Sequence, residues 1–269
     1  MKFALGGCHS KRIIKKASIN GDMEVSPFLY FPCLIDLLKG GLEVPSEKIY
    51  KMPYIEGRDE TSKFIEETLD FDLNRKFVQT LLSAEYDYLI VELTTLIFNT
   101  YKVTYKGKQV YSVNLHSPEC YEYVGLEHEK VNITKDMAYK AIDEFVDFLR
   151  NNIDLNKVIL LKNSLPKFGL DENNKIHIWD TNTFETKRTQ DVILYTEYFN
   201  SILPEVRMFQ ETNLQIARNL NDTPLHITRE SERLQGLLFR EFLLGENLKK
   251  EISEATLTLQ KQIQEGLSL

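Results

Sequence analysis

A continuous apolar run near the middle of the sequence is the feature that most constrains the fold. Residues 86–93 read YDYLIVEL, and Leu89, Ile90 and Val91 follow one another without a polar residue between them. A strand with one solvent-exposed face alternates apolar and polar residues, whereas a strand buried on both faces of a parallel sheet is continuously apolar. The run therefore predicts a central strand of a parallel sheet covered by helices on both sides.

Further short apolar runs and helical patterns alternate along the chain. The runs that predict strands are residues 3–5, 49–52, 157–162 and 206–210. The segments with apolar residues at spacings of three and four, which predict helices, are 28–38, 61–82, 134–151 and 190–203. Strands that alternate with helices form βαβ units, so the pattern predicts a three-layer α/β/α sandwich.

Three segments depart from this alternation. TYKVTYKGKQVYSVNL (residues 100–115) alternates polar and apolar residues around a Gly-Lys pair and predicts a hairpin insertion at about 100–116. KIHIWD (175–180) predicts a second hairpin or an edge strand. The tail is helical in pattern, which gives an α/β domain over 1–229 and a C-terminal helical extension over 230–269. We expect the apolar face of the tail to be covered, by the domain or by a homodimer.

Composition narrows the class of protein. The 269 residues are 42% hydrophobic with a formal net charge of −7, so general affinity for nucleic acid is not expected. Three scattered cysteines without CxxC spacing argue against disulfides and a zinc site, and we expect no metal. No 18-residue apolar run and no signal peptide are present, so we expect no membrane span and a cytoplasmic location.

The first predicted strand ends in a block rich in chemistry-bearing residues. Gly6 and Gly7 precede Cys8, His9 and Ser10, and a basic helical pattern follows. Glycine permits a positive φ or the close approach of another group, and Ser10 is a possible N-cap. The alternative reading is a tight turn with a buried cysteine.

Other polar residues are expected at the same edge of the sheet, because ligands bind beyond the carboxyl ends of parallel strands. Lys162 and Asn163 follow the fourth strand, and Asp222 and His226 lie past the fifth. A nucleophile early in the chain with an Asp and a His near its end suits acyl transfer: His deprotonates the nucleophile and Asp orients the imidazole.

The order of these blocks resembles SGNH/GDSL-type hydrolases. It is most similar to an uncharacterised SGNH-like family of bacterial capsule and glycan gene clusters, whose members begin with a Gly-Ser-Cys-x-Ser-Arg type of block. Here that block reads Gly6-Gly7-Cys8-His9-Ser10-Lys11, followed by DYLI at 87–90 and VILLKN at 158–163. The resemblance implies a parallel flavodoxin-like sheet and acyl-ester chemistry, as O-acyl transfer or ester hydrolysis on a carbohydrate in cell-surface polysaccharide biosynthesis.

The sequence departs from the hydrolase pattern at several positions. Cys8 stands at the serine position and Ser10 lies two residues on, so either is a candidate nucleophile. The Gly-x-Asn-Asp block is absent, which leaves Asn99 as the only candidate for its amide donor, and Asp222 and His226 are one residue further apart than in the family. The alternative function is therefore a non-catalytic glycan- or partner-binding protein.

A second resemblance concerns the thiol. Some capsule O-acetyltransferases begin with a Gly-Asn-Cys-Gln block and bind coenzyme A, which implies acetyl-CoA as a possible acyl donor here. Lys11, Arg12 and Lys15 could contact its phosphates, although such a cluster is commonly a solvated helix face. We expect the substrate and the oxyanion to be contacted by Gly7, His9, Asn99, Lys162 and Asn163. His9 could serve either as a base or as an oxyanion donor.

Overall fold

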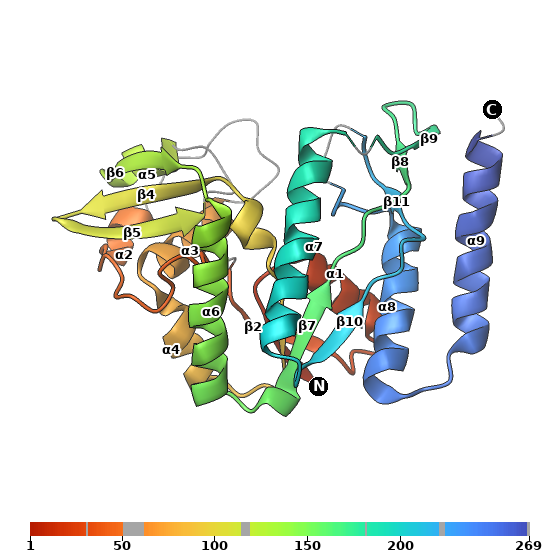
Figure 1. Ribbon diagram of the computed structural model, residues 1–269, viewed down its shortest axis with the longest axis horizontal. Helices are drawn as coiled ribbons and strands as arrows, with labels where there is room; N and C mark the ends of the chain where they lie inside the picture. Colours follow the sequence, from red (N-terminus) through yellow and green to blue (C-terminus); the bar gives the residue numbers. More distant parts are fainter. Residues whose placement is uncertain (31, 51–61, 114–118, 181, 221–223, 268–269) are drawn as a thin grey trace. The chain divides into compact units, whose positions relative to one another are not determined.

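A computed structural model gives the structure of the chain and describes residues 1–30, 32–50, 62–113, 119–180, 182–220 and 224–267. The chain divides into two compact units (Figure 1). The sheet unit comprises Met1–Ser26, Tyr86–Glu92 and Asn156–Leu269, and the insert unit comprises Pro27–Glu85 and Leu93–Leu155. In this division the C-terminal helices belong to the sheet unit, and the predicted boundary at residue 229 stays a prediction.

The sheet unit is built on a five-stranded sheet in the order β10-β7-β3-β1-β2. The pairs β1–β3, β3–β7 and β7–β10 are parallel, and Ile90 lies opposite both Leu5 and Ile159. Numbered along the chain, the strand order is 5-4-3-1-2, the flavodoxin-like order. The bounds are β1 (Lys2–Leu5), β2 (Glu24–Phe28), β3 (Tyr88–Val91), β7 (Val158–Lys162) and β10 (Arg207–Gln210).

The central position of β3 confirms the prediction made from its apolar run. β3 lies between β1 and β7 in the sheet, and Leu89, Ile90 and Val91 are buried. β1, β7 and β10 also confirm predicted strands. Ile49, predicted as a strand, instead ends the short helix α2 (Ser46–Ile49), and residues 51–52 of that prediction lie outside the described residues.

Helices flank this sheet, so the predicted α/β/α sandwich is confirmed. α1 (Cys8–Ala17) follows β1 and packs along α8 (Arg229–Leu244), whose Phe239 ring contacts both Phe3 of β1 and Phe209 of β10. The two helices approach closely at Gly236, where a Cβ atom would lie 2.7 Å from the backbone of Lys16. α7 (Phe184–Ile202) packs against β7, and Figure 1 shows it in front of the sheet with α1 behind.

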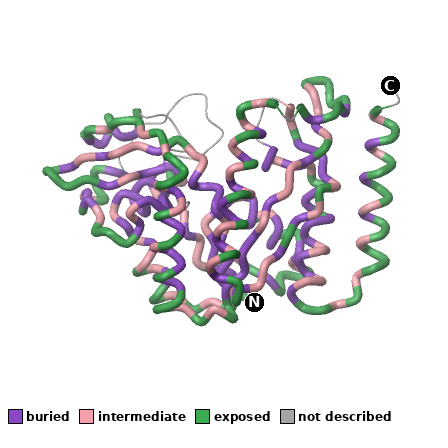
Figure 2. Tube along the Cα trace, in the orientation of Figure 1, coloured by how far each residue is buried: buried purple, intermediate pink, exposed green. Residues whose placement is uncertain are grey.

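The C-terminal helices cover their apolar faces within the chain. α9 (Lys249–Leu267) is mostly exposed or half-buried, with buried residues at intervals of four along one face (Figure 2). Its buried Ala255, Leu259 and Ile263 pack in one cluster with Leu234 of α8 and Ile176. A small sheet supplies the other side of the cluster, in the order β11 (Ile216–Ala217), β8 (Phe168–Leu170), β9 (Ile176–Ile178). The predicted helical tail with a covered apolar face is confirmed, and a second copy of the chain is not needed to cover it.

The insert unit combines helices with an antiparallel sheet in the order β5-β4-β6. β4 (Thr100–Tyr105) and β5 (Lys108–Val113) form the predicted hairpin, and their turn places Lys106 and Gly107 at φ 49° and 79°. β6 (Glu127–Val131) joins β4 on the other side. The helices are α3 (Ser62–Leu73), α4 (Lys76–Ser83), α5 (Glu119–Val124) and α6 (Lys135–Asn152), with short 3₁₀ turns at Thr94–Ile97 and Leu155–Lys157.

Two helix predictions in the insert unit are corrected. Residues 28–30 and 32–38 do not form a helix: Tyr30 and Asp36 have positive φ angles, and the Cys33 backbone N–H donates to the Asp72 side chain instead. The predicted helix 61–82 breaks after α3, where Arg75 takes a left-handed conformation at φ 52°. By contrast, α6 begins as predicted, since Thr134 accepts a hydrogen bond from the Met137 N–H.

Candidate functional site

The candidate site lies at the carboxyl edge of the main sheet, at the point where the strand order reverses. β1 and β3 are neighbours there although the chain leaves β1 toward β2 and continues from β3 toward β7. Ligands of doubly wound sheets bind in the crevice at such a switch point. Cys8 follows β1 after two glycines and Glu92 follows β3 directly, so both residues stand at this position.

Cys8 is the first residue of α1. Gly7 is the N-cap in an extended conformation, and Cys8 is a half-buried thiol without a disulfide. Ser10 is therefore not the N-cap that its sequence position indicated: it lies in the first turn, is buried, and donates its hydroxyl to the Gly7 carbonyl over 3.1 Å. Of the two candidate nucleophiles, Cys8 is the more accessible.

Gly7 makes room for a carboxylate. A Cβ atom at residue 7 would lie 2.2 Å from Oε2 of Glu92, so only glycine permits this approach. The close approach, rather than a positive φ, is the reason for glycine, because Gly7 has φ −101°. Oε2 also accepts a hydrogen bond from the Ser10 backbone N–H over 3.2 Å. Glu92 thus places a negative charge at the N-terminus of α1, where the helix dipole favours it.

His9 and Glu211 form a buried pair at the next position of the helix. His9 Nε2 contacts Glu211 Oε1, although 202 residues separate them in the sequence, and their side chains are 7% and 0% exposed. Burial alone would lower the pKa of His9. The charge of Glu211 and the hydrogen bond to it outweigh burial, and the charge of Glu92 adds to them, so the pKa rises to about 9. At neutral pH His9 is therefore an imidazolium cation.

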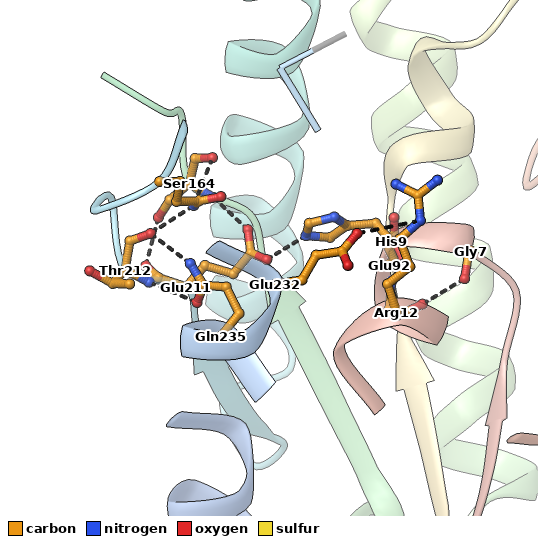
Figure 3. A network of polar contacts seen from close by, with 11 residues as sticks. Gly7, His9, Arg12, Glu92, Ser164, Glu211, Thr212, Glu232 and Gln235 are labelled. Carbon is orange, nitrogen blue, oxygen red and sulfur yellow. Dashed lines mark hydrogen bonds and ion pairs between the residues drawn. The ribbon is translucent and has the colours of Figure 1, made fainter. Parts of the chain in front are cut away.

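Glu211 is fixed by the loop that follows β7. The Ser164 backbone N–H donates to Glu211 Oε2 over 3.0 Å, and the Ser164 hydroxyl donates to the Glu211 carbonyl over 2.7 Å. Next to Glu211, Thr212 receives hydrogen bonds from Gln215 and from Gln235 of α8. Figure 3 shows this network on one side of the His9–Glu211 contact, with Glu92 and Gly7 on the other. The position of the His9 ring is thus set from β10, the β7 loop and α1.

Two buried polar groups of the sheet unit have no hydrogen-bond partner among the described residues. Asn163 is 1% exposed, and neither its amide nitrogen nor its amide oxygen is bonded. Arg12 on α1 places Nε 3.7 Å from Glu232 Oε1, while its Nη1 is buried and unbonded. Such groups are uncommon in folded proteins and call for an occupant such as water or a ligand. Lys162, also predicted for the site, pairs with Glu197 at 2.9 Å.

The remaining predicted residues are not assembled with Cys8 by the described contacts. His226 is half-buried, and its carbonyl accepts a hydrogen bond from the Arg218 N–H. Asp222 lies outside the described residues. Asn99 is exposed and precedes β4 in the insert unit, so it is not assigned to this site. The roles of Asp222 and His226 therefore stay predictions.

Sequence reasoning missed Glu92 and Glu211. Both follow a strand directly, Glu92 after Val91 and Glu211 after Gln210. The rule that functional side chains gather past the carboxyl ends of parallel strands would have indicated them. A glutamate directly after a strand is also typical of a solvated turn, so this signal alone does not single out either residue.

Two further observations bear on function. Within the described ranges, no group of three His, Cys, Asp or Glu residues is arranged to hold a metal ion, and no helix is long and apolar enough to cross a membrane. In comparisons with known proteins, no family model, curated protein or solved structure matches the chain.

Proposed function

We propose that the sheet unit carries out acyl-ester chemistry on a carbohydrate, by O-acyl transfer or by hydrolysis, with the thiol of Cys8 as nucleophile. The observation that supports this best is the position of Cys8: a partly accessible thiol at the first residue of α1, at the switch point of a flavodoxin-like sheet. Helix N-termini favour negative charge, so this position suits a thiolate and the oxyanion that forms next to it, while the Glu92 carboxylate at the same N-terminus acts against the thiolate.

The proposed reaction has two steps. In the first, the Cys8 thiolate attacks the carbonyl carbon of the ester or of acetyl-CoA; the C–S bond forms, and the leaving oxygen or sulfur departs with a proton. In the second, a sugar hydroxyl or water attacks the thioester and the thiol is regenerated. His226 would take the thiol proton with Asp222 orienting it. The setting we propose is cytoplasmic, in cell-surface polysaccharide biosynthesis.

A second candidate is binding of a glycan without catalysis. Two observations favour it: the unbonded amide of Asn163, which could bond a sugar hydroxyl, and the carboxylate of Glu92, which already accepts the Ser10 N–H at the start of α1. A non-catalytic protein would retain glycan binding after Cys8→Ala and would not turn over esters.

The test is hydrolysis of an aryl acetate, measured with and without acetyl-CoA and glycan acceptors. Cys8→Ala should abolish turnover, and Ser10→Ala should leave most of it. His226→Ala should lower turnover by a factor comparable to that of Cys8→Ala. The double variant should lower it little further, since the effects of residues in one catalytic unit are not additive. Activity that survives Cys8→Ala and disappears in Ser10→Ala would reassign the nucleophile. A wild type without activity would favour the binding protein.

A further inference from the structure

We propose that His9 is a further catalytic residue of this reaction, a fixed cationic donor whose Nδ1–H binds the carbonyl oxygen as it becomes negative. The inference rests on the proposed function and assigns His9 one role, the donor and not the base. Glu211 and Glu92 are its positioning residues. They hold the imidazolium from the ends of β10 and β3.

The geometry leaves one ring nitrogen available. Nε2 is occupied by Glu211, and among the described residues Nδ1 has no hydrogen-bond partner. Nδ1 is also not among the fully buried polar atoms that lack a partner, and the side chain keeps 7% exposure. His9 therefore keeps one N–H for a ligand, on the residue that follows Cys8 in the first turn of α1.

The charges around His9 keep both ring nitrogens protonated. Glu211 and Glu92 favour the cation, whereas burial and the nearby Arg12 oppose it. Arg12 itself is near Glu232 of α8, at 3.7 Å. Glu211 holds Nε2, and the raised pKa favours the protonated ring, so we assign His9 the donor role and not that of the base. When Cys8 attacks, the carbonyl π electrons move to oxygen, and a positive donor stabilises that charge more strongly in the transition state than in the substrate.

Gly7 offers a way to move Glu92 without removing it. The extended conformation of Gly7 suits alanine, and the three atoms nearest to the added Cβ all belong to the Glu92 carboxylate. Because that carboxylate ends a flexible side chain, it will move aside and the backbone will stay. Both variants should then lower the pKa of His9. Gly7→Ala displaces the negative charge of Glu92, and Glu92→Gln removes it.

The experiment follows the imidazole of His9 by NMR titration in the full chain, together with kcat for aryl acetate hydrolysis. His9 of the wild type should titrate near 9. Glu92→Gln should lower that midpoint by about one unit, and Gly7→Ala should lower it by less. His9→Gln, which removes the cation, should lower kcat by about 100-fold. Glu265→Gln, the same change at an exposed carboxylate paired with Lys261 of α9, should change neither quantity.

The outcomes separate this inference from the proposed function. A wild type that hydrolyses the ester while His9 titrates at its ordinary value overturns the inference and leaves the function standing. The same holds if Glu92→Gln changes neither the midpoint nor kcat. A wild type that turns over no ester, with His9 titrating near 9, overturns the function and the donor role together.

Discussion

The two units each contain a buried ion pair, and the pairs differ in what their atoms contact. In the insert unit Asp72 and Arg75 lie 3.0 Å apart, with side chains that are 1% and 4% exposed. Asp72 also accepts the backbone N–H groups of Cys33 and Val113, and Arg75 donates to the carbonyls of Ile35 and Tyr111. In the sheet unit, His9 contacts Glu211 through one nitrogen and keeps the other available.

The difference distinguishes a structural pair from a functional one. The Asp72–Arg75 pair supplies hydrogen bonds to a segment without helix or strand, residues 32–41, and joins it to α3 and β5. Burial raises the pKa of Asp72, although Arg75 and the hydrogen bonds to Asp72 oppose the shift. Because Arg75 Nε is itself buried without a hydrogen-bond partner among the described residues, unbonded atoms alone do not separate the pairs. The separation lies in position: the His9–Glu211 pair stands at the carboxyl edge of the main sheet, and His9 directly follows the Cys8 thiol in α1. We therefore expect the first pair to determine stability and the second to determine chemistry.

The largest expected effect is on stability in the insert unit. Arg75→Met leaves the Asp72 charge buried without its partner and should lower the free energy of unfolding by about 3–5 kcal/mol. Urea denaturation followed by circular dichroism measures it. Lys63→Met is the matched control, since Lys63 is 79% exposed and 3.8 Å from Glu67. Similar losses in the two variants would contradict a structural role for the buried pair.

Glu211→Gln should lower the free energy of unfolding by less than Arg75→Met does. The glutamine oxygen can still accept the Ser164 N–H, but the charge that holds His9 is lost, so we expect a loss of about 1–3 kcal/mol in the same assay. Because Glu197 is half-exposed, Glu197→Gln is the control and should have little effect. If Glu211→Gln destabilises the protein as much as Arg75→Met does, the His9–Glu211 pair is as important for stability as the Asp72–Arg75 pair, which contradicts the distinction between them.

The pH dependence follows from the raised pKa of His9. A group whose pKa is higher in the folded state binds its proton more tightly there, so its contribution to stability is fully present below the unfolded value. That contribution should be complete below pH 6.5 and disappear as the pH rises through about 9. The difference in unfolding free energy between wild type and His9→Gln, measured across this range, should shrink accordingly. A difference that stays constant would show that His9 is not charged.

The smallest expected effect concerns Gly7. Gly7→Ala should lower the free energy of unfolding by about 1 kcal/mol in the wild type and by much less in a Glu92→Ala background, because the closest contacts of the added Cβ are with that carboxylate. A double-mutant cycle of unfolding free energies measures the coupling. Equal costs in both backgrounds would mean that Gly7 serves the turn and not the approach of Glu92.

The sequence predicted the elements whose patterns are local. The apolar run of β3, the hairpin of β4 and β5, and the capped helix α6 each carry their signal in consecutive residues. The segment 28–38 has no such local signal, because the Tyr30 ring packs against Phe64 and Phe71 of α3. The backbone N–H of Cys33 bonds to Asp72, 39 residues away. Helical spacing alone does not distinguish such a segment from a helix.

The candidate site shows the same limit. The GGCHS block indicated where the site begins, and Cys8 and His9 stand there. Nothing local indicated that His9 meets Glu211, since only the strand order brings β1 and β10 into one sheet. The closeness of Glu92 to Gly7 likewise depends on the pairing of β1 with β3.

The central claim is that Cys8 forms a covalent acyl intermediate, and peptide mass spectrometry tests it most directly. After brief incubation with an aryl acetate at neutral pH and acid quenching, the acetyl group should be located on Cys8, at a level that saturates with substrate. Cys33 and Cys120 are buried and serve as internal controls. Acetyl-Cys8 that disappears in His226→Ala would support the account. Acetylation at Ser10, or none at residue 8 while hydrolysis proceeds, would contradict it.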